Sequence, residues 1–108
     1  MARAGRRALS RDDIAAFRAL ADHAAEVAEG GSRQWRKLKD LAIAARARSA
    51  VLCSDPGGHC DRLITLSVET AESVTPQALY PALADLARRV QERVIQFEAV
   101  RQMEARHG

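Results

Sequence analysis

The stretch PALADLARRVQERVIQFEAVRQM, residues 81–103, contains the clearest helical pattern in this chain. Its apolar residues recur every three or four positions, which is the period of one helix face. They are Leu83, Leu86, Val90, Val94, Phe97, Val100 and Met103. This spacing predicts a long C-terminal helix that starts at Pro81. The stripe is close to a coiled-coil seam, although Arg93 takes one seam position and Val94 replaces it.

Two amphipathic segments precede this helix. Ser10 followed by Asp12 and Asp13 is typical of a helix start, because the hydroxyl caps free backbone N–H groups and the carboxylates favour the first turn. The first helix is predicted to end at Gly30-Gly31. A second helix is predicted from an N-cap at Ser32 to about Leu52, before the break SDPGG at residues 54–58.

Residues 60–73 fit either a helical face or an alternating strand. A single strand has no evident partner in this chain, so we predict a helix. Thr75 is then read as an N-cap, with Pro76 at the first position of a short turn. The whole pattern predicts an all-α fold: a small antiparallel bundle of about four helices. We assign residues 1–9 to a flexible basic arm and residues 10–108 to a single domain.

Composition limits the size of the core. The chain has 108 residues, of which 22 are Ala and only four are aromatic (Phe17, Trp35, Tyr80 and Phe97). A core this thin often grows by association, so we predict a homodimer.

No run of 18 apolar residues is present and no apolar segment follows the basic start. We therefore expect no membrane span, no secretory signal and a cytoplasmic location.

The C-terminal seam is longer than the other predicted helices can easily cover. Its far end is therefore predicted to dock onto another protein or a second copy, as amphipathic helices do. The predicted contact residues are Val94, Phe97 and Val100, with Arg93 and Arg101 as orienting charges. This hypothesis makes the protein a small regulatory or adaptor protein that acts by protein–protein binding.

A nucleic-acid-binding module is the first alternative. Residues 1–48 hold eleven Lys/Arg against six Asp/Glu, a balance of +5, whereas residues 49–108 have a balance of −2. Rows of cations neutralise phosphates. The candidate residues are Arg3, Arg6 and Arg7 in the arm and Arg33, Arg36 and Lys37 at the start of the second helix. Trp35 shares a stripe with apolar residues, so we expect it in the core rather than stacked on a base.

A thiol or metal sensor is the second alternative. Cys53, His59 and Cys60 flank one loop, and thiols and imidazoles are metal ligands. Their spacing is not a zinc pattern, and nearby carboxylates raise a thiol's pKa rather than lower it. Two half-buried cysteines in a reducing compartment are the simpler interpretation, so we predict no metal and no cofactor.

The histidines do not indicate catalysis. Arg18–His23 and Arg101–His107 share the R-x4–6-H spacing of helical ribonucleases, but two residues at so loose a spacing arise easily by chance. The chain has no Ser/His/Asp set, Gly-rich phosphate loop or Glu-x-x-His pair. We therefore expect a binding protein rather than an enzyme.

Overall fold

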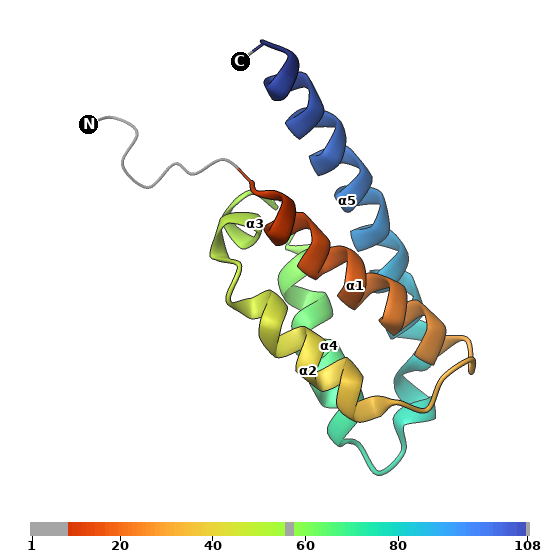
Figure 1. The fold of residues 1–108 in the computed structure, drawn as a ribbon. Coiled ribbons are helices and arrows are strands. Elements are labelled where there is room, and N and C mark those ends of the chain that lie inside the picture. Colours follow the sequence, from red (N-terminus) through yellow and green to blue (C-terminus); the bar gives the residue numbers. More distant parts are fainter. Residues whose placement is uncertain (1–8, 56–57, 108) are drawn as a thin grey trace.

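The computed structural model describes residues 9–55 and 58–107, and every regular element among them is helical (Figure 1). The elements are α1 (Arg11–Ala28), α2 (Trp35–Arg46), α3 (Ser49–Cys53), α4 (His59–Glu72), the 3-10 helix η1 (Pro76–Leu79) and α5 (Tyr80–His107). The predicted all-α bundle with a long C-terminal helix is confirmed. The predicted arm lies outside the described residues, except that Leu9 packs against the core.

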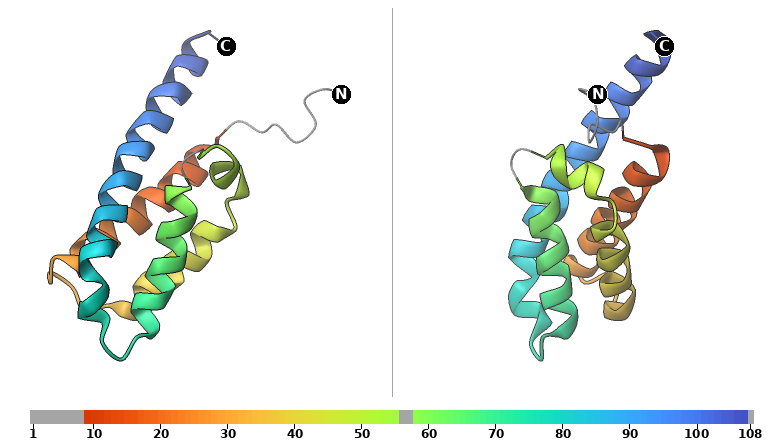
Figure 2. Two further views of the ribbon diagram at one scale, coloured as in Figure 1. Left: turned by 180° about the vertical axis from the view of Figure 1, so that it is seen from behind. Right: turned by 90° about the vertical axis from the view of Figure 1, so that its left-hand side faces the viewer.

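The four longer helices pack antiparallel to their neighbours. α1 lies along α5 and α2 lies along α4, while α4 also contacts α5 (Figure 2). Phe17, Leu20, Leu38, Leu63 and Leu83 are fully buried between them. The core therefore draws one large side chain or more from each long helix, and small alanines fill the gaps.

α1 has well-defined caps at both ends. The Ser10 hydroxyl accepts a hydrogen bond from the Asp13 N–H, and the Asp13 carboxylate accepts one from the Ser10 N–H, each at 3.0 Å. At the other end Gly30 adopts φ 82°, and the N–H of Gly31 bonds to the carbonyl of Glu26. This Schellman arrangement needs the left-handed residue that the sequence supplies. The predicted limits of the first helix are thus correct.

α2 starts two residues later than predicted. Ser32 accepts a bond from the Gln34 N–H in the loop, and Gln34 is the N-cap without a side-chain bond. The helix instead begins where Trp35 reaches the core and its indole N–H donates to the Tyr80 hydroxyl at 3.2 Å. This bond ties the start of α2 to the start of α5.

The prediction of one helix up to Leu52 is also wrong, because the chain breaks at Ala47 and Arg48. A continuous helix would place Val51 roughly 120° around from the buried Ala45, away from the core. The break returns Val51 to the core on α3. It also lets the Arg48 guanidinium approach the buried Asp13 carboxylate, 3.5 Å away, at the start of α1.

α4 confirms the helical reading of residues 60–73. Its buried residues, including Cys60, Leu63, Ile64 and Ser67, recur at helical spacing. Thr75 does not cap η1 with its side chain, but Pro76 occupies the first turn as predicted. α5 then begins at Tyr80, one residue before Pro81.

α5 is longer than the body it packs against. Its 28 residues span about 42 Å, against about 27 Å for the 18 residues of α1. Figures 1 and 2 show its C-terminal turns extending past the start of α1 and past α3. We call residues 99–106 the α5 tail.

Candidate functional site

The predicted contact residues Val94 and Phe97 are covered by the chain itself. Their side chains are 2% and 7% exposed, packed in the core between α5 and its neighbours. The prediction that these two residues are left over for a partner is therefore wrong. The reason is that α1 and α4 pack along α5, and both residues belong to the core that these helices share.

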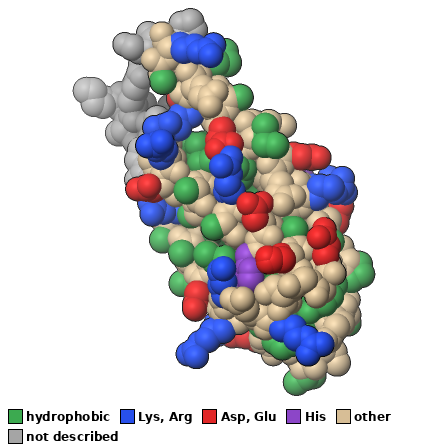
Figure 3. All heavy atoms as spheres, turned by 45° about the vertical axis from the view of Figure 1, so that its right-hand side comes forward, with side chains coloured by type: hydrophobic (Ala, Val, Ile, Leu, Met, Phe, Trp, Pro, Cys, Tyr) green, Lys and Arg blue, Asp and Glu red, His purple; other side chains and the backbone are tan. Residues whose placement is uncertain are grey.

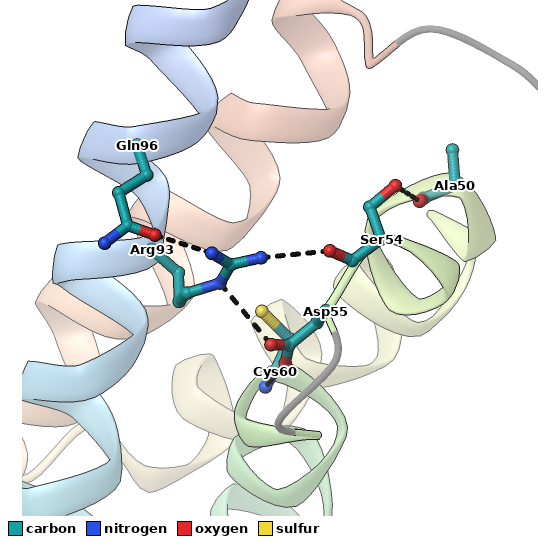
Figure 4. A network of polar contacts seen from close by, with 6 residues as sticks. All are labelled: Ala50, Ser54, Asp55, Cys60, Arg93 and Gln96. Carbon is teal, nitrogen blue, oxygen red and sulfur yellow. Dashed lines mark hydrogen bonds and ion pairs between the residues drawn. The ribbon is translucent and has the colours of Figure 1, made fainter.

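The Arg93 side chain also makes its contacts within the chain itself (Figure 4). Its guanidinium lies 4.6 Å from the centre of the Phe97 ring and donates to the Ser54 carbonyl at 2.9 Å. It also donates to the Gln96 side chain, and its Nε lies 3.5 Å from Oδ1 of Asp55. Arg93 thus joins α5 to the end of α3, and it is not the orienting charge at a rim that we predicted.

Asp55 holds the other side of this contact. Its side chain is buried, and Oδ2 accepts the N–H of Cys60 at 2.6 Å in the first turn of α4. A carboxylate is favourable at a helix N-terminus, where backbone N–H groups are free. Arg93, Asp55 and α4 therefore form one connected polar contact beneath the α5 tail.

The α5 tail carries the exposed apolar residues of this end. Val100 is 54% exposed and Met103 58% exposed, one turn apart on the helix. Beside them lies a depression of about 390 Å³, which we call the apolar depression. Leu9, Ser54, Phe97, Val100, Arg101 and Glu104 contribute to its walls. α5 does expose apolar residues, but they are Ile95, which is 65% exposed, and Val100 and Met103 on the tail, rather than Val94 and Phe97.

Three of the six proposed nucleic-acid residues lie in the described part of the chain. Arg33, Arg36 and Lys37 are exposed around the start of α2, near the end of α1. Leu9, to which the arm is joined, lies at the other end of α1, about 27 Å away along an 18-residue helix. Arg3, Arg6 and Arg7 lie outside the described residues.

The cysteine loop does not have the features of a reactive thiol pair. Cys53 is exposed and Cys60 is buried, and neither forms a disulfide. Burial, and next the Asp55 carboxylate, raise the pKa of the Cys60 thiol to about 12, so it stays protonated at neutral pH. Residues 9–55 and 58–107 contain no group of three His, Cys, Asp or Glu side chains, His59 included, placed to hold a metal ion.

His23 has a structural environment. It is buried on α1, and its Nε2 lies 3.0 Å from the carbonyl oxygen of Gln34, so the ring fastens the α1–α2 loop. His23 thus packs at the α1–α2 end of the bundle and holds this loop in place. The side chain of His107 lies outside the described part of the chain.

Comparison with known proteins identifies no relative. No family model, no curated protein and no solved structure matches this chain. Among the described residues, no helix is long and apolar enough to cross a membrane. Function therefore has to be inferred from the geometry of the chain itself.

The sequence contained a signal for the real start of the exposed surface. The buried positions of α5 follow a spacing of four and three residues, from Leu83 through Ala87, Val90 and Val94 to Phe97. The next residue in that series is Arg101, which is polar. This change from apolar to polar residues indicates that the part of α5 covered by the bundle ends near Phe97. The contact between Arg93 and Asp55 could not be predicted from spacing, because 38 residues separate the two side chains in the sequence.

Proposed function

We propose that this protein is a small regulatory or adaptor protein that binds another protein through its α5 tail. One observation carries the proposal: α5 continues past the bundle and exposes Val100 and Met103 there. Residues three apart on a projecting helix are the usual anchors of a helix that enters a partner's groove. A projecting helix of this kind buries more of its surface in a partner's groove than against a flat partner surface.

The charge of the tail favours a partner with an acidic rim. Two arginines, Arg101 and Arg106, stand against one glutamate, Glu104, which leaves a net charge of +1 on the α5 tail. Rim charges of opposite sign raise association rates and select partners. A second copy would bring the same positive tail, so we favour a different protein. The predicted homodimer remains a prediction, and light scattering on the purified chain measures it directly.

The test is a comparison of two variants in pull-downs from the native cell after nuclease treatment. Val100→Glu combined with Met103→Glu places charges on the tail. Ile43→Glu changes an equally exposed aliphatic residue, at 53%, on α2. A bound protein that is lost with the first variant and retained with the second supports the proposal. Equal retention of every bound protein by both variants contradicts it.

Salt separates this proposal from nucleic-acid binding. An apolar contact changes little between low and moderate salt, whereas binding that neutralises several phosphates weakens steeply. The partner should therefore remain bound at 300 mM salt. Loss of all binding when salt rises or nuclease is added would favour the alternative based on Arg33, Arg36 and Lys37.

A further inference from the structure

A second depression lies on the other side of α5, between its last turns and the first turns of α1. We call it the basic depression. Its volume is about 330 Å³, and its walls include Arg11, Ile14, Arg18, Glu98, Arg101 and Gln102. Figure 3 shows the face formed by α1 and α5, where Lys and Arg side chains are interspersed with Asp and Glu from the upper end to the lower. Arg101 also borders the apolar depression, but neither Val100 nor Met103 lines this one.

The basic depression has an uncompensated positive charge. Three guanidinium groups line it, against the single carboxylate of Glu98, which gives a balance of +2. Glu98 is paired with Arg18. Neither Arg11 nor Arg101 forms an ion pair or side-chain hydrogen bond with any described residue. The next carboxylate along this face, Asp22, accepts a hydrogen bond from Gln91.

Arg101 is less exposed than Arg11 and Arg18. Arg101 continues the buried series of α5, one turn after Phe97, and it is half-buried rather than free in solvent. Like charges gathered in one partly enclosed depression repel each other, and an anion bound between them removes that repulsion. The site is therefore arranged to accept negative charge.

We propose that the basic depression binds a terminal phosphate group, a tetrahedral oxyanion that carries close to two negative charges. Arginine presents paired N–H donors that match phosphate oxygens, and a phosphate monoester carries about −1.5 to −2 at neutral pH. That charge matches the balance of +2, whereas a carboxylate or a phosphodiester supplies only −1. The volume exceeds that of a phosphate alone, so the group can belong to a small molecule or to a phosphorylated side chain.

The experiment is a titration of the intact protein followed by NMR of the arginine Nε–Hε groups. The probes are O-phosphoserine, inorganic phosphate and an eight-residue oligothymidylate, each at constant ionic strength. Saturable shifts of Arg11, Arg18 and Arg101 with O-phosphoserine are expected. Binding should weaken between pH 7.5 and pH 5.5, because the monoester gains a proton near pH 6.

Matched variants make the test decisive. Arg101→Gln should weaken O-phosphoserine binding by about tenfold or more, since it removes charge-assisted hydrogen bonds. Arg106→Gln removes an exposed arginine of the same helix outside the depression and should leave binding unchanged. Shifts that never saturate, or an equal loss in both variants, overturn the site. Tighter binding of the oligothymidylate than of O-phosphoserine overturns the preference for a terminal phosphate.

Discussion

Arg93 shows how one side chain can be misjudged from its register. On a helical projection it lies beside the seam of α5, where an arginine normally faces solvent. In the structure its guanidinium lies over the Phe97 ring, and its N–H groups face Ser54 and Asp55 directly after α3. Long amphipathic side chains can thus take the place of apolar ones at the edge of a small core.

We predict that Arg93→Ala lowers the free energy of unfolding by about 2–3 kcal/mol, because it leaves the buried Asp55 carboxylate without its cation. This estimate is at the low end for buried pairs, since the Arg93 side chain is 24% exposed. Arg89→Ala, which removes an exposed pair with Asp85, should cost less than about 1 kcal/mol. Urea unfolding followed by circular dichroism measures both. Equal losses of unfolding free energy in the two variants would show that the Arg93–Asp55 contact does not stabilise the fold.

Cys60 should make stability depend on alkaline pH. The folded protein raises the pKa of this thiol from 9.0 to about 12, mainly by burial and then through Asp55. Between these values the unfolded chain loses the proton while the folded chain keeps it, so stability falls as pH rises from about 9 to 12. The limiting slope for one such group is about 1.4 kcal/mol per pH unit.

The control for this prediction is Cys60→Ala, which removes the titrating group. Unfolding in urea at pH 7.5, 9, 10 and 10.5 should give a shallower decline for the variant than for the unchanged protein. Parallel declines would mean that the thiol ionises as easily in the folded chain as in the unfolded one.

The helix ends could be predicted from the sequence only where neighbouring residues determine them. The limits of α1 follow from Ser10, Asp13 and Gly30, which act within a few positions of themselves. The break between α2 and α3 follows from distant contacts, since it is the core that draws Val51 inward and Asp13 that draws Arg48. The helical spacing of the sequence predicts one helix through this break. The alanines at 44, 45, 47 and 50 have high helix propensity, so nothing local indicates that the helix ends there.

The capping box of α1 gives a prediction at this scale. Ser10→Ala should destabilise the protein by about 1 kcal/mol, because the Asp13 N–H loses its acceptor. Ser49→Ala is the matched control, since the Ser49 hydroxyl is exposed and makes no hydrogen bond within the described residues. It should change stability by less than about 0.5 kcal/mol. Thermal unfolding of the two variants side by side checks the difference.

For the whole molecule, the surplus length of α5 was predictable, but the place where it becomes exposed was not. Helix lengths read from the sequence indicated that the last helix outruns its neighbours. Which residues are left uncovered depends on how α1 and α4 pack along α5, and helix lengths alone do not give that packing. Of the predicted contact residues, Val100 alone is apolar and exposed, while Arg101 borders both depressions.

If the α5 tail serves binding rather than folding, its apolar residues should be dispensable for stability. We predict that the combined change Val100→Glu and Met103→Glu alters the unfolding free energy by less than about 0.5 kcal/mol, as surface substitutions usually do. Phe97→Ala should cost about 3 kcal/mol, since this ring is buried. Urea unfolding of both variants distinguishes the two roles. A large loss on changing the tail would mean that the tail belongs to the core.

Site-specific photo-cross-linking in the native cell shows whether the α5 tail contacts another protein. A photoreactive amino acid is placed at position 103 on the α5 tail or, as a control, at position 43 on α2. We predict one discrete protein adduct from position 103 that position 43 does not give, and an adduct mass different from that of two copies of this chain. No adduct from position 103, or the same adducts from both positions, would contradict the account.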